Sequence, residues 1–146
     1  MRGIISTLLL FYCVQGFALQ PSAELSPQQV VRYQLDSLRT NNADNDGIAS
    51  TFEFASPANK RMTGPLSRFS ALFDNPRYAP MLNHQSSDIE ALSNDGQYAS
   101  FSIELVDQNG SIHHYRFELS RQVGGSCTQC WMTDSVMWAP KPGRSA

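Results

Sequence analysis

The stretch FSIELVDQNGSIHHYRFEL, residues 101–119, decides the fold because it alternates apolar and polar residues on both sides of a turn. The turn is Asp107-Gln108-Asn109-Gly110, whose residue types favour a tight reversal of the chain. A period of two on each side is typical of half-buried strands. The apolar positions are Phe101, Ile103 and Leu105 before the turn and Tyr115, Phe117 and Leu119 after it. The stretch therefore predicts a β-hairpin with one buried face.

Turn signals on either side of this hairpin extend it to a meander. Asn94-Asp95-Gly96 is a strong hairpin signal, and it predicts a weak strand at about His84–Leu92. Gly124-Gly125 reverses the chain again on the other side, so we expect the last strand at Trp131–Trp138. The sequence thus predicts about four antiparallel strands.

Upstream of Pro80 the apolar spacing changes to that of helices. Ser26, Pro27 and Gln29 are the residue types of a helix start with a capping box. The stripe on the first helix consists of Val31, Leu35 and Leu38, and further helical segments follow at 48–55, 57–61 and 66–75. Helices followed by a meander predict an α+β domain. We expect the helices to pack on a curved sheet around a cavity.

The first residues have the features of a secretory signal peptide. Arg2 is basic, residues 4–14 are mostly apolar, and Gly16-Phe17-Ala18 places small residues before a cleavage point. The apolar run is too short to span a bilayer, which takes about 20 residues. We expect a signal peptide at 1–18 and a periplasmic or secreted protein. The remainder divides into a lead-in at 19–25, one domain at 26–138 and a disordered tail at 139–146.

Charge and composition argue against two classes of partner. The net charge is −2 and no block of basic residues occurs, so nothing favours nucleic acid or an anionic membrane surface. No second long apolar segment follows the first, and we expect no membrane attachment after cleavage.

Two of the three cysteines remain after cleavage. Cys13 would leave with the signal peptide, so Cys127 and Cys130 form an even pair in an oxidising compartment. We predict a local disulfide between them. Their spacing also fits half of a zinc site, a redox pair or two free thiols. A single cysteine pair requires no metal, and we expect no metal and no cofactor.

Five segments are similar to an uncharacterised family, domain of unknown function 4864. They are residues 54–61, 63–69, 78–84, 119–122 and 130–134. The resemblance implies a nuclear-transport-factor-2-like (cystatin-like) cone, in which a bent sheet wraps helices around a pocket. That fold hosts enzymes, ligand binders and interaction modules alike, so it does not decide function. It also implies a homodimer through the sheet as one option.

The predicted pocket contains one acid–base candidate. His113 shares the inward face of its strand with Tyr115 and Phe117. On the last strand, regular alternation puts Asp134 on one face with Met132, Val136 and Trp138. The other face consists of Trp131, Thr133, Ser135 and Met137, and either face fits burial. If the face that contains Asp134 is buried, Asp134 and His113 form an acid–base pair. Tyr115, Phe117, Met132 and Trp138 then line a ligand pocket.

A partial calcium-loop pattern occurs at Asn42–Glu53. Asn42 in the first position and Ala49 in the eighth depart from the motif. A polar turn between two helices is the better interpretation.

No complete catalytic set is visible in the sequence. We therefore expect a non-catalytic module that binds a small ligand or another protein. The alternative is a pocket enzyme of the isomerase, dehydratase or hydrolase type that uses Asp134 and His113.

Overall fold

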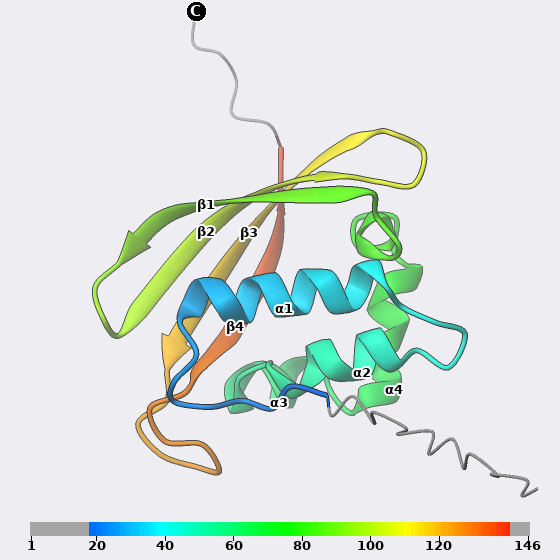
Figure 1. Ribbon diagram of the computed structural model, residues 1–146. Coiled ribbons are helices and arrows are strands. Elements are labelled where there is room, and N and C mark those ends of the chain that lie inside the picture. The colour runs from blue at the N-terminus through cyan, green and yellow to red at the C-terminus, as the bar shows by residue number, and fades with distance from the viewer. Residues whose placement is uncertain (1–17, 141–146) are drawn as a thin grey trace, which may run out of the picture.

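Helices cover one face of a four-stranded antiparallel sheet (Figure 1). The computed structural model describes residues 18–140. The predicted signal peptide therefore lies outside the described residues, apart from Ala18, and so do Cys13 and residues 141–146. The predicted α+β class is confirmed, and helices precede strands along the chain.

The sheet is a meander with the strand order β1-β2-β3-β4. The strands are β1 (Ser86–Asn94), β2 (Tyr98–Val106), β3 (Ile112–Arg121) and β4 (Trp131–Ala139). β2 and β3 pair in continuous register, with Phe101 opposite Phe117 and Ile103 opposite Tyr115. Successive side chains point to opposite faces, so Phe101, Ile103, Leu105, Tyr115, Phe117 and Leu119 all lie on the inner face, which the helices cover.

Four α-helices and two 3₁₀ turns form the second layer. They are α1 (Pro27–Arg39), α2 (Asp46–Glu53), α3 (Pro57–Thr63), α4 (Leu66–Ala71), η1 (Leu72–Asp74) and η2 (Ala79–Met81). The hydroxyl of Ser26 accepts from the Gln29 amide, and the Gln29 side chain accepts from the Ser26 amide. This capping box fixes the start of α1 as predicted. Ser56 caps α3 in the same way by accepting from the Asn59 amide.

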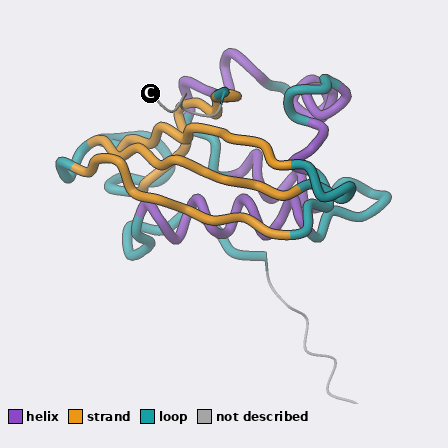
Figure 2. Tube along the Cα trace, turned by 90° about the horizontal axis from the view of Figure 1, so that it is seen from above, coloured by secondary structure: helices purple, strands orange, loops and turns teal. Residues whose placement is uncertain are grey.

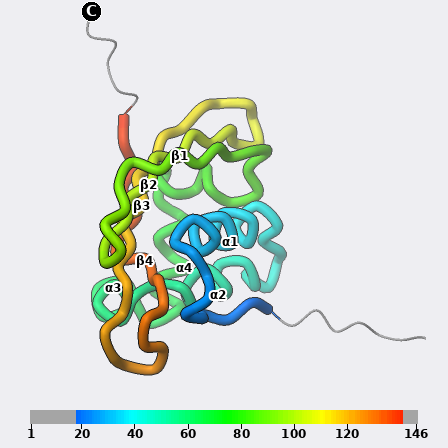
Figure 3. Tube along the Cα trace, turned by 60° about the vertical axis from the view of Figure 1, so that its left-hand side comes forward, coloured from blue at the N-terminus to red at the C-terminus, as the bar shows by residue number. Residues whose placement is uncertain are grey.

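The core lies between the helices and the inner face of the sheet. Figures 2 and 3 show the strands in one layer and α1 and α2 beside it. Val31 and Leu35 of α1 are fully buried, and so are Ile103 and Leu105 of β2. Burial of each such side chain stabilises the fold by about 1.5–3 kcal/mol.

One irregularity interrupts the pairing of β3 with β4. Leu119 pairs with Thr133 but Glu118 pairs with Ser135, which leaves Asp134 as an extra residue in β4. This β-bulge means that Thr133 and Val136, although three residues apart, both lie on the inner face. The two faces of β4 that regular alternation predicts are therefore wrong, because each predicted set of four residues is divided between the two sides of the sheet. Trp131 and Thr133 face inward before the bulge, and Val136 and Trp138 face inward after it.

The free edge of β4 is bridged to the helical layer at Thr133. Thr133 forms a parallel bridge with Ala55, and its amide donates to the Phe54 carbonyl at 2.8 Å. The Ser56 amide donates to the Thr133 carbonyl, also at 2.8 Å. The Thr133 hydroxyl contacts Gln34 Oε1 on α1 at 2.6 Å. These bonds hold the first part of β4 against the helices and leave the edge beyond the bulge beside a cavity.

Candidate functional site

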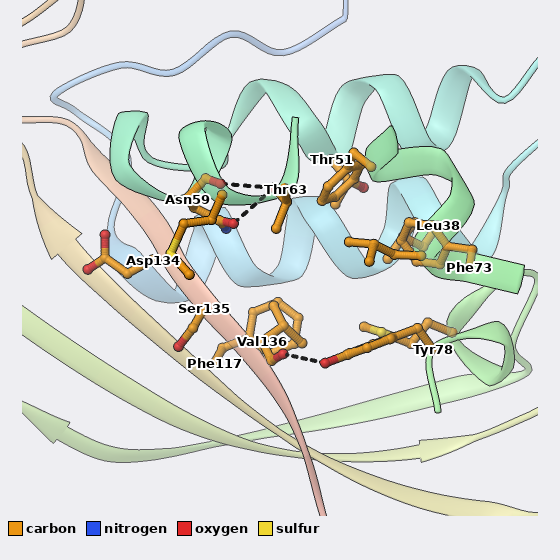
Figure 4. A pocket seen from close by; sticks show the side chains of 14 residues that line it. Leu38, Thr51, Asn59, Thr63, Phe73, Tyr78, Phe117, Asp134, Ser135 and Val136 are labelled. Carbon is orange, nitrogen blue, oxygen red and sulfur yellow. Dashed lines mark hydrogen bonds between the residues drawn. The ribbon is translucent and has the colours of Figure 1, made fainter. Parts of the chain in front are cut away.

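A cavity of about 260 Å³ lies between β4 and the helices (Figure 4). α3 and α4 form one side, η1 and η2 form the end, and residues 134–136 of β4 form the opposite side. The cavity is lined by Leu38, Thr51, Asn59, Met62, Thr63, Phe69, Leu72, Phe73, Tyr78, Met81, Phe117, Asp134, Ser135 and Val136. Most of these side chains are apolar.

The depth of the cavity follows from the exposure of its walls. Met81 is 2% exposed and Phe117 is 1% exposed, whereas Met62 is 74% exposed. Met62 on α3, with half-buried Asp134 and Ser135 on β4, therefore forms the mouth of the cavity. The far end is apolar and closed.

Aromatic packing shapes the closed end. The rings of Phe69 and Phe73 meet edge to face at 5.7 Å, and the ring of Phe52 lies 4.9 Å from that of Phe69. Such arrangements are favoured by the aromatic quadrupole. They fix the apolar wall that α4 and η1 present to β4.

Hydrogen bonds immobilise the polar residues around the cavity. The Asn59 amide nitrogen donates to the Thr133 carbonyl at 3.1 Å, and the Thr63 hydroxyl lies 2.9 Å from the Asn59 carbonyl and 3.1 Å from Asn59 Oδ1. The Tyr78 hydroxyl donates to the Val136 carbonyl at 3.2 Å and links η2 to β4. Figure 4 shows the Asn59–Thr63 and Tyr78–Val136 bonds at the cavity wall.

Asp134 lies at the mouth because it is the bulge residue of β4. Figure 4 shows its carboxylate turned away from the apolar side chains. Its side chain forms no hydrogen bond or ion pair with any other residue of the described part. A half-buried carboxylate at an apolar opening is available to a ligand or to solvent.

The structure does not bring His113 and Asp134 together. His113 faces inward as predicted, but its Nε2 lies 2.7 Å from Oδ2 of Asp107, at the turn between β2 and β3. The cavity lining does not include His113. Asp107 also accepts from the amides of Asn109 and Ser111. The hydrogen bond from His113, followed by that from Ser111, lowers the pKa of the Asp107 carboxyl.

Of the four pocket residues predicted from the sequence, Phe117 lines the cavity. Tyr115 is buried beside it, where its hydroxyl donates to the Arg77 carbonyl at 2.7 Å, and burial raises its pKa. Trp138 lies under the Arg77 guanidinium, 5.8 Å from the ring centroid. Met132 is buried on the outer side of β4, opposite Ser120. The bulge is the reason that Met132 and Trp138 do not share a face.

Cys127 and Cys130 form a disulfide in the loop between β3 and β4. Their Cα atoms are 5.6 Å apart, an ordinary disulfide separation. The bridge closes the loop just before Trp131, so it fixes the point at which β4 begins. A disulfide suggests an oxidising environment.

The calcium-loop pattern is a polar turn in the structure. The Asn42 side chain bonds the amide and the carboxylate of Asp46, where α2 begins. Within residues 18–140, no three histidine, cysteine, aspartate or glutamate side chains come together as metal ligands. No described helix is long and apolar enough to span a membrane.

Most of the residues that line the cavity were not predicted from the sequence. Phe69, Leu72 and Phe73 belong to the segment 66–75, which was predicted as helical from its apolar spacing, but that spacing does not show that they face β4 across an empty volume. Asn59 and Thr63, four residues apart on α3, share one side of that helix. This spacing was the available signal for their pairing at the cavity wall.

The family of this chain is decided by a match that covers most of its length. The model of the family Domain of unknown function (DUF4864) matches residues 21–146. The chain belongs to this family. No curated protein matches its sequence. Family membership assigns no activity, so any functional proposal must be based on the cavity.

Proposed function

We propose that this chain is an exported, non-catalytic domain of the nuclear-transport-factor-2-like (cystatin-like) type that binds a small apolar molecule in its cavity. The observation that carries the proposal is the apolar, open volume between β4 and α3–α4. Native ligand sites are concave and mostly apolar, with few polar groups. The disulfide Cys127–Cys130 supports export, because such bonds persist in oxidising compartments.

The cavity volume sets the size of the ligand. An apolar cavity of about 150 Å³ accepts benzene, so the cavity of about 260 Å³ accommodates roughly ten non-hydrogen atoms on the same scale. A medium-length alkyl chain or a two-ring aromatic compound is of this size.

Binding is favoured over catalysis by the chemistry of the lining. Thr51, Asn59, Thr63 and Tyr78 already hydrogen-bond the protein. Asp134 has no histidine partner, since His113 is paired with Asp107. General acid–base catalysis needs such a group within reach of the substrate.

The test is calorimetric titration with 1-octanol. This compound is uncharged, and its eight carbons and one oxygen are close to the roughly ten non-hydrogen atoms that the cavity accommodates. We expect a dissociation constant on the order of 1 mM or lower. Val136→Phe fills part of the cavity and should weaken binding at least about tenfold. The matched control is Val123→Phe, because Val123 is 81% exposed.

Two results would contradict the proposal: no heat of binding for the unaltered protein, or equal affinities for both phenylalanine variants. Native mass spectrometry of the exported protein gives an independent check on export. It should find a chain that begins at Leu19 and whose mass is lower than that of the reduced chain by two hydrogen atoms, as one disulfide requires.

A further inference from the structure

The two ends of the cavity differ in charge. Asp134 is the only charged residue among those that line it in the described part of the chain, and no lysine, arginine or histidine does so. Lys60 of α3 lies nearby in sequence, but its ammonium donates to the Glu53 carbonyl at 3.1 Å and lies over the Phe52 ring. The mouth therefore carries one negative charge, and the closed end carries none.

The hydrogen-bonding capacity left at the mouth is mainly that of acceptors. Asn59 uses one of its two amide N–H groups on the Thr133 carbonyl, and Thr63 uses its hydroxyl proton on Asn59. An ionised carboxylate only accepts, and Asp134 offers both oxygens. A ligand group that donates several hydrogen bonds is the complement of this set.

The arrangement of these groups suits an amphiphile. Figure 4 shows Asn59, Thr63, Asp134 and Ser135 at one end of the cavity and Leu38 and Phe73 at the other. An apolar body can fill the closed end while a charged head stays at the half-exposed mouth. A head left at the mouth keeps part of its hydration, so no isolated charge is buried.

We propose that the ligand of this cavity is a cationic amphiphile, an apolar body of about ten non-hydrogen atoms that carries a protonated primary amine paired with Asp134. The inference rests on the proposed function and adds the chemical class of the ligand. A carboxylate or phosphate head is disfavoured because it would face Asp134 with no basic residue in the lining to offset the repulsion.

The experiment compares three ligands that share one alkyl chain. Octylamine is cationic at pH 7, 1-octanol is neutral and octanoate is anionic. Because the ion pair is partly exposed, we expect octylamine to bind about fivefold tighter than 1-octanol, and octanoate to bind more weakly than 1-octanol. Raising the salt concentration should weaken octylamine binding only.

Variants at the mouth assign this preference to one side chain. Asp134→Asn should reduce the preference for octylamine over 1-octanol to about onefold. Asp134→Lys should transfer the preference to octanoate. The matched control is Asp88→Asn, which neutralises an exposed carboxylate on the outer face of the sheet. Circular dichroism verifies that each variant is folded.

The outcomes separate the two proposals. If 1-octanol binds but octylamine binds no tighter, or if Asp134→Asn keeps the preference, the cationic ligand class is wrong and the cavity proposal stands. If none of the three compounds binds, the cavity proposal itself is overturned, and the ligand class with it.

Discussion

The β2–β3 hairpin and β4 lie side by side in one sheet but have opposite characters. The hairpin pairs without interruption from Tyr98 to Val106, and its inner face is core except at His113, beside the turn. β4 carries a bulge at Asp134, and its edge is bridged only at Thr133 within the described residues. Regular pairing fills most of the space beneath the hairpin, which contributes Phe117 to the cavity wall, whereas the irregular strand contributes residues 134–136. Within the sheet, the stability of this domain and its proposed site therefore come mainly from different strands.

The largest expected effect comes from breaking the register of the hairpin. Deletion of Ser102 removes one residue between Phe101 and Ile103, so one half of β2 must turn its apolar side chains outward. Each half holds two fully or nearly fully buried side chains, and loss of their burial costs about 4–10 kcal/mol, which is comparable to the usual stability of about 5–15 kcal/mol.

We expect the Ser102 deletion to be unfolded by circular dichroism. Ser102→Ala keeps the register and should change the free energy of unfolding by no more than about 0.5 kcal/mol. A cooperative thermal transition in the deletion variant would show that the register is not decisive.

Deletion of Asp134 sharpens the comparison, because the same kind of change should be tolerated in β4. Without the bulge residue, Thr133 and Ser135 become neighbours and the pairs with Leu119 and Glu118 become regular. Inward residues stay inward, so we expect a folded protein that loses about 1–2 kcal/mol of stability.

Urea denaturation measures this loss, with Asp134→Ala as the length-preserving control. If the Asp134 deletion unfolds the chain as the Ser102 deletion does, the bulge is essential to the fold and the contrast between the two strands fails.

The smallest effect concerns the turn that joins β2 to β3. The pKa of Asp107 is lowered in the folded state by His113 and by backbone amides. A lowered carboxyl pKa gives stability that is present above the unfolded value of about 3.8 and is lost as the pH falls through the folded value. Asp107→Asn should therefore be less stable than the unaltered protein at pH 7 and equal to it in strong acid.

Thermal melts from pH 7 to about pH 2 measure this convergence. His113→Phe gives a second readout, because nuclear magnetic resonance titration should then find the Asp107 pKa closer to its ordinary value. A constant difference between the melts at all pH values would contradict the linkage.

The same contrast explains what could be predicted from the sequence. The hairpin was predictable because Phe101, Phe117 and their neighbours alternate without error around a turn of strong turn formers. The caps at Ser26 and Ser56 were equally local, since each bond joins residues three positions apart. Such features depend on a few adjacent residues.

The site depends on interactions that short patterns do not contain. Nothing in the residues around Asp134 marks it as a bulge, and assuming regular alternation gave two wrong faces for β4. His113 was correctly placed on the inner face, but its partner is Asp107, six residues earlier, because the turn brings that carboxylate back to the strand. The cavity needs Phe69, Tyr78 and Val136 to meet from three separate segments.

The contacts of Thr133 also determine when the domain can complete its folding. Its hydroxyl pairs with Gln34, 99 residues earlier, and its backbone pairs with Phe54 and Ser56. Contacts over such separations form late, because a long loop must be ordered before they stabilise anything. A chain emerging from the ribosome thus cannot finish its core until the last strand is available. It should stay open until then, and the Cys127–Cys130 bond closes the loop at the start of that last strand.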